Sequence, residues 1–150
     1  MTEAMKKISS KQNVSEPLSI NHVALKSKNI EQLAEFYQSI LDLPLLKTFS
    51  DENGLRSIWL SLGNSIFMLE RSDCDEDTTT TPADFFVDKP GYHLLALTVS
   101  VEQQSELKTR LSDSNITIEH ESDYTIYFRD PDGNRLGLSS LDVRSITNSP

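Results

Sequence analysis

Two histidines, His22 and His93, occupy matching places in two similar segments of the chain. The first segment reads INHVALKSKNIEQLAEFYQSIL and the second reads GYHLLALTVSVEQQSELKTRL. In both, the histidine opens a short apolar stretch that a helical pattern follows. Histidine serves as a metal ligand and as a general acid or base near neutral pH. The repetition therefore indicates two side chains that share one functional surface.

The elements that position these histidines also repeat. Asn29 and Ser100 precede the two helical patterns, each with a glutamine three residues later, as in a capping box. Short alternating stretches follow each helix, at 57–62 and 66–70 in the first half and at 125–129 and 134–139 in the second. Each half therefore predicts β-α-β-β-β. We expect an α+β fold in which two such modules pair around a cup.

Composition shifts divide the chain into a tail, one domain and a second tail. Residues 1–17 and 143–150 are polar or lack periodicity, and we expect both to be loose. The domain would cover 18–142, with modules at about 18–71 and 91–142. The acidic, Thr-rich loop 72–90 links them, and a loop of this length is often a lid or a linker. Its two aromatic side chains, Phe85 and Phe86, are expected to bring its end back onto the domain.

Strand alternation predicts which side chains line the cup. Phe67, Leu69, Leu136 and Leu138 form the apolar sets that face the helices. The opposite faces then carry two histidines, a row of pocket residues, and Leu95 and Leu97 beside His93. In this register Met68 corresponds to Gly137. The pocket residues are Trp59, Met68, Glu70, Tyr127, Arg135, Gly137 and Ser139.

Several of these side chains have two readings. Trp59 would stack on a planar ligand or close the sheet against a partner subunit. Arg135 would bind a carboxylate or phosphate, or pair with Glu70 inside the cup. Asp130, Asp132 and Asn134 are explained by turn chemistry, and His120, in the polar stretch EHES, is expected to be exposed.

The duplicated modules, the opening HVAL and the ending RDPDGNRLGL resemble the vicinal oxygen chelate superfamily. That superfamily contains glyoxalase I, extradiol dioxygenases and the fosfomycin and bleomycin resistance proteins. The resemblance covers roughly residues 18–142. It implies a cup that holds one divalent metal, with ligands from the opening and the last strand of each module. Dimers are common in this group.

Carried over to this chain, the resemblance places metal ligands at His22 and His93 and leaves Met68 and Gly137 at the other two positions. Glu70 would complete a two-histidine, one-carboxylate set and would also be the catalytic base. The metal would be Fe, Mn, Ni, Co or Zn. Glycine has no ligand atom and a thioether is a poor ligand for hard divalent ions, so complete glyoxalase I chemistry is disfavoured.

Two functions remain open. The first is a metal-dependent lyase, isomerase or dioxygenase that acts on a small vicinal-oxygen substrate. The second is a metal-free protein of bleomycin-resistance type that binds or sequesters a small molecule, with His22, Glu70 and Arg135 as polar anchors. Whether the chain is an enzyme at all depends on which of the two is correct.

Composition limits the partners. The chain has 150 residues and a formal net charge of −9, which argues against nucleic acid and anionic membrane surfaces. No apolar run is long enough to span a bilayer. The single cysteine, Cys74, excludes an internal disulfide, and a cytoplasmic location is expected. A small molecule and a second copy of the chain are the partners that remain.

Overall fold

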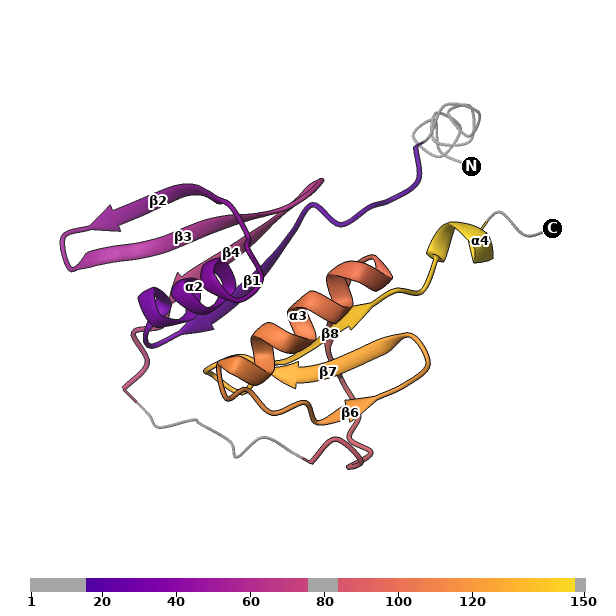
Figure 1. Ribbon diagram of the computed structural model, residues 1–150. Coiled ribbons are helices and arrows are strands. Elements are labelled where there is room, and N and C mark those ends of the chain that lie inside the picture. Colours follow the sequence, from indigo (N-terminus) through magenta and orange to yellow (C-terminus); the bar gives the residue numbers. More distant parts are fainter. Residues whose placement is uncertain (1–15, 76–83, 148–150) are drawn as a thin grey trace.

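The computed structural model describes residues 16–75 and 84–147, and in them a β-α-β-β-β unit occurs twice (Figure 1). The first unit contains β1 (His22–Ser27), α2 (Ile30–Ser39), β2 (Leu45–Asp51), β3 (Gly54–Leu62) and β4 (Ser65–Arg71). The second contains β5 (Leu95–Thr98), α3 (Val101–Asp113), β6 (His120–Glu121), β7 (Thr125–Arg129) and β8 (Arg135–Ser139). The predicted α+β class with two matching modules is confirmed.

Each module forms its own four-stranded sheet. The strand orders are β1-β4-β3-β2 and β5-β8-β7-β6. In both sheets the opening strand pairs in parallel with the last strand, and the other pairs are antiparallel. The helix between the first two strands of each module is the crossover that such a parallel pair requires.

The two helices begin where the sequence predicts. The Asn29 side chain accepts a hydrogen bond from the Gln32 backbone N–H, and Ser100 forms a complete capping box with Gln103. Helix α2 buries the stripe Ile30, Leu33, Ala34 and Tyr37. Helix α3 buries only Leu111, and its Val101 is exposed, which agrees with the thinner apolar stripe of the second segment.

Outside the two modules the described chain has little regular structure. A short helix, α4 (Val143–Thr147), lies where the sequence predicts a loose tail. Most of the predicted N-terminal tail and residues 76–83 of the linking loop fall outside the described residues. The domain boundaries themselves stay a prediction.

The modules contact each other through their helical sides. The Tyr37 hydroxyl of α2 donates a hydrogen bond of 2.6 Å to Asp130, which follows β7 in the second module. The neighbouring Phe36 ring lies 6.3 Å from that of Phe128, centroid to centroid. In the other direction, Arg110 of α3 donates to the Ile40 carbonyl at 2.8 Å. One apolar core therefore runs through both modules.

Asp130 is the polar centre of this contact. Its carboxylate also accepts hydrogen bonds from the backbone N–H groups of Asp132 and Asn134 and from the Asn134 side chain. Burial holds the pKa of Asp130 above its usual value, although these donors act in the opposite direction. Burial and the adjacent carboxylate raise the pKa of Tyr37. The predicted turn role of Asp130 is therefore correct, but it is combined with a bond between modules.

Replacing Tyr37 with phenylalanine should destabilise the protein, and the loss should grow with pH. Because the folded-state pKa of Asp130 is raised, the stability due to its protonation is present in acid and is lost as pH rises through that pKa. Without the Tyr37 hydroxyl as donor, the ionised Asp130 carboxylate is stabilised less. The loss of stability in the variant therefore increases as pH rises and Asp130 ionises. We expect about 1–3 kcal/mol near neutral pH and less at pH 4, measured by urea unfolding.

Tyr92→Phe is the matched control, because the Tyr92 side chain is fully exposed. It should leave the free energy of unfolding unchanged at every pH. A Tyr37→Phe variant as stable as the wild-type protein, or one whose loss of stability is the same at pH 4 and pH 8, would contradict the role assigned to this hydrogen bond.

Candidate functional site

The open face of each sheet, meaning the face away from its helix, carries most of the predicted site residues. In the first sheet, β1 and β4 align His22 with Ile66, Ala24 with Met68 and Lys26 with Glu70. Paired residues share a face, and the residues between them, Phe67 and Leu69, are buried in the core. His22, Met68 and Glu70 therefore lie on the open face, as predicted from alternation.

Trp59 completes the centre of this face. It pairs with Met68 across β3 and β4. Its indole N–H donates to the Ser57 hydroxyl at 2.9 Å, and its ring lies 4.8 Å from that of Phe49. The indole is half-buried and held by neighbours on its own sheet, so it forms a fixed apolar platform.

The second sheet presents a corresponding set. Its open face carries Tyr127 paired with Gly137, Arg129 paired with Arg135 and Thr125 paired with Ser139. The residues between them, Leu136 and Leu138, are buried in the core. The predicted residues Tyr127, Arg135, Gly137 and Ser139 therefore share this face.

The register of β5 corrects one part of the sequence prediction. Leu95 and Leu97 pair with the buried Leu136 and Leu138, so they face the helical side and not the open face. Ala96 pairs with Gly137 in the second module, and Ala24 pairs with Met68 in the first. Strands β1 and β5 therefore correspond at an offset of 72 residues. The motif HVAL of β1 thus matches LLAL of the second module.

It follows that Leu94 corresponds to His22, and His93 stands one residue before that place. The Leu94 Cδ1 atom lies 3.2 Å from the position that a Cβ on Gly137 would take. The helix caps, Asn29 and Ser100, keep an offset of 71. Matching the two histidines to each other was therefore wrong by one residue, because the chain between strand and helix is one residue shorter in the second module.

His93 is bound by another side chain of its own module. An Arg135 N–H lies 3.0 Å from His93 Nδ1. Arginine has no acceptor, so Nδ1 accepts, and the neutral ring then carries its proton on Nε2. Neither ring nitrogen offers a lone pair to a metal. His22 differs, since its Nδ1 faces the Asn21 side-chain oxygen at 2.8 Å and leaves Nε2 as an acceptor.

Glu70 and His22 are too far apart to share an ion. Glu70 lies four positions along β4 from Ile66, the partner of His22, which is about 13 Å of strand. Side chains that stand off a sheet do not meet over that span, and metal–ligand bonds are about 2 Å long. Within residues 16–75 and 84–147, no three His, Cys, Asp or Glu side chains gather closely enough to hold an ion. The donor set does not fit a divalent metal.

A cluster of rings lies on the open face of the second sheet, and sequence reasoning found only part of it. Phe85, from the linking loop, lies 4.6 Å from the His120 ring in a stacked arrangement and 4.8 Å from the Tyr127 ring. His120 pairs with Tyr127 across β6 and β7, so it is not the exposed residue that the polar stretch EHES suggested. The two adjacent phenylalanines in a largely polar loop were the available signal.

Two arginines share one carboxylate beside this cluster. Glu119 forms an ion pair with Arg129 and a longer one, 3.4 Å, with Arg135. The Arg135 side chain is largely buried. Arg135 therefore does not pair with Glu70, as one of the two interpretations predicted, but with Glu119, which immediately precedes β6 in its own module.

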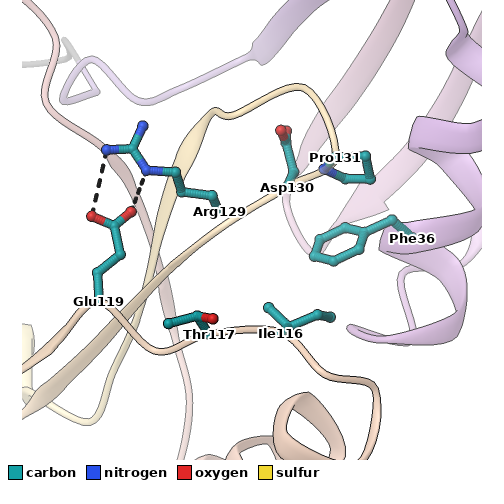
Figure 2. A pocket seen from close by; sticks show the side chains of 7 residues that line it. All are labelled: Phe36, Ile116, Thr117, Glu119, Arg129, Asp130 and Pro131. Atoms are coloured by element: carbon teal, nitrogen blue, oxygen red, sulfur yellow. Dashed lines mark hydrogen bonds and ion pairs between the residues drawn. The ribbon is translucent and has the colours of Figure 1, made fainter. Parts of the chain in front are cut away.

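Two hollows involve residues of both modules. One, of about 380 Å³, is formed where α2 meets the second module (Figure 2). There Phe36 faces Pro131, while the Glu119–Arg129 pair closes the other side. The second is an apolar groove of about 640 Å³ between the modules, lined in part by Val23, Leu95 and Leu107. Neither hollow contains a predicted metal ligand, but the groove is lined by Leu95 and Leu97, which alternation had assigned to the cup.

Comparison with known proteins identifies the family. The sequence profile of the Glyoxalase/Bleomycin resistance protein/Dioxygenase superfamily matches residues 19–138. The chain belongs to this superfamily. The predicted relationship is thereby confirmed over both modules.

Solved structures of this superfamily share the fold at low sequence identity. The fosfomycin resistance protein FosX from Listeria monocytogenes, solved with Mn(II) and a dihydroxypropylphosphonic acid, is 15% identical, with a TM-score of 0.66, over 89% of this chain and 100% of that one. Lactoylglutathione lyase from Agrobacterium tumefaciens is 18% identical, with a TM-score of 0.58, over 83% and 95%. A glyoxalase/dioxygenase from Nostoc punctiforme is 17% identical, with a TM-score of 0.62, over 83% and 96%. Among the described residues of this chain, no helix has the length and apolar composition needed to cross a membrane.

Gly137 should tolerate a side chain poorly. A Cβ there would lie 3.0 Å from Thr125 Cγ2 as well as 3.2 Å from Leu94 Cδ1. We expect Gly137→Ala to reduce the free energy of unfolding by about 1 kcal/mol or more. Thr125→Ser removes the crowded methyl group and keeps the hydroxyl that bonds Ser139, so the double variant should recover part of the loss. A fully stable Gly137→Ala would show that the face is more open than described.

Proposed function

We propose that this protein is a metal-free member of the superfamily that binds a small molecule on the open faces of its sheets. The supporting observation concerns the four positions at which the resemblance to the superfamily implies metal ligands. These places hold His22, Met68, Leu94 and Gly137, and only the first offers a nitrogen or oxygen ligand. One imidazole cannot hold a divalent ion in competition with water.

The remaining chemistry of the faces suits ligand binding. Small-molecule sites are mostly apolar, with a few placed polar groups. Trp59 and Met68 supply apolar surface in the first module, and Tyr127 supplies an aromatic ring in the second. Arg135, held by Glu119 and His93, is a fixed cationic anchor. The lyase, isomerase and dioxygenase chemistries need a metal-binding set that these residues do not supply.

Metal content tests the proposal. Protein purified without chelators should contain far less than one equivalent of Fe, Mn, Ni, Co or Zn by elemental analysis, and its melting temperature should not change when these ions are added. A variant with Leu94→His, Gly137→Glu and Thr125→Ser should gain affinity for Zn²⁺ or Mn²⁺, because it places two donors side by side on the open face. Leu94→His alone is the matched control and should bind weakly.

The opposite result is equally defined. Wild-type protein that carries a stoichiometric metal, lost in both His22→Ala and His93→Ala, would overturn the metal-free proposal and restore the two-histidine site.

We also infer that two copies of the chain associate. Strand β2 leaves Leu45 and Leu46 about half exposed, at 51% and 52%, and apolar side chains of this kind are commonly covered in subunit interfaces. Sedimentation at micromolar concentration should give a dimer. Leu46→Lys should shift it toward the monomer, because a lysine is costly to bury. Val143→Lys on α4, where the wild-type side chain is 54% exposed, is the control. A monomeric wild-type protein would overturn this inference.

A further inference from the structure

Phe85 occupies the centre of the ring cluster on the second open face. Its ring is stacked on His120, with an interplanar angle of 27°, and is tilted against Tyr127 at 54°. The Arg135 guanidinium carbon lies 5.1 Å from the Phe85 ring centroid, and the His93 ring lies 5.4 Å away. This one benzene ring is therefore in contact with the rings of His120, Tyr127 and His93 and with a cation.

The backbone around Phe85 directs this ring and not its neighbour into the cluster. The Val87 N–H donates to the Asp84 carbonyl at 3.0 Å, and the Phe86 N–H donates to the Asp84 carboxylate at 3.2 Å. This tight turn places Phe85 against the sheet and leaves Phe86 at 76% exposure. Phe86 touches His120 only edge-on, at 5.4 Å.

The walls around Phe85 are those of a site for a planar aromatic ring. The His120 and Tyr127 faces favour offset stacking, and the Arg135 guanidinium adds a cation–π contact. All three side chains belong to strands of the sheet, whereas Phe85 belongs to the described segment 84–94, which forms neither helix nor strand. The walls are held by β6, β7 and β8, so removing the loop ring would leave them in place.

The charges beside the ring favour an acidic substituent. Arg129 and Arg135 contribute two positive charges and Glu119 one negative charge. Asp84 belongs to the same turn as Phe85, so its negative charge would leave with that ring. A guanidinium held in one orientation binds a carboxylate through paired N–H donors.

We propose that Phe85 occupies the aromatic subsite of this protein's own ligand, which is a planar aromatic carboxylate whose ring takes the place of Phe85 on His120 and Tyr127. The proposal rests on the small-molecule binding proposed above and specifies the class of molecule bound. Phe85 then acts as an internal competitor, so the apparent affinity of the ligand is its intrinsic affinity reduced by the fraction of molecules in which the ring is withdrawn.

Removing the ring should therefore strengthen binding of a simple probe. We expect Phe85→Ala to bind benzoate about tenfold more tightly than the wild-type protein in calorimetric titration. Cyclohexanecarboxylate, which has the same charge and a non-planar ring, should bind Phe85→Ala much more weakly than benzoate. Phe85→Leu, which keeps an apolar side chain in the turn, should fall between wild type and Phe85→Ala.

Two further variants are matched controls. Phe86→Ala removes an equal ring from the next position and should leave benzoate affinity within about twofold of wild type, because that ring is exposed. Phe85→Ala combined with Tyr127→Ala should lose the gain, since one wall of the subsite is removed. Circular dichroism of each variant shows whether it is folded, and Phe85→Leu provides the test if Phe85→Ala is not.

Equal benzoate affinity in wild type, Phe85→Leu and Phe85→Ala would overturn the proposal, and so would equal binding of benzoate and cyclohexanecarboxylate. These results would leave the metal-free function intact, because that function is judged by metal content alone. Conversely, a stoichiometric metal in the wild-type protein would overturn the function whatever benzoate does.

Discussion

The pairing of the opening strand with the last strand decides what each module presents on its open face. Side chains alternate along a strand, so a shift of one residue exchanges the buried set for the open set. In the first module this pairing puts His22 on the same open face as Met68 and Glu70. In the second it puts Ala96 beside Gly137 and turns Leu95 toward the core. The donor set, the ring cluster and the shape of the faces all depend on these two registers.

Much of the fold was predictable because its signals are local. The stripe of α2, its asparagine cap and the DPDG turn each act within a few residues of chain. The register of β5 was not predictable, because the strand has only four residues. Residue types align His93 with His22, whereas the strand pairing aligns Leu94 with His22. The bond between Tyr37 and Asp130 joins residues 93 positions apart, and nothing in either local sequence indicates its partner.

The site was predictable only where strand alternation alone decides which face a side chain occupies. Trp59, Tyr127 and Arg135 fall on the faces that alternation assigns to them. What Tyr127 and Arg135 contact is decided by residues that sequence patterns treat as ordinary loop, namely Phe85, Glu119 and His120. The position of the loop depends on which of its rings packs against other side chains, and those side chains come together only when the sheet has folded. The two modules therefore share a topology and differ in chemistry, with an indole platform on one and a ring and guanidinium cluster on the other.

The one-residue difference in spacing between strand and helix limits how this surface can change. A point substitution alters one side chain and leaves its neighbours where they are. No substitution at position 93 moves that residue to the place that Leu94 occupies, since this place is set by the pairing of Ala96 with Gly137. Only a change in chain length on one side of β5 would do so, and the same change would turn Leu95 and Leu97 out of the core. The alternation of the strand thus ties the composition of the open face to the packing of the interior, and a ligand lost by this route can return by substitution at position 94 but not at position 93.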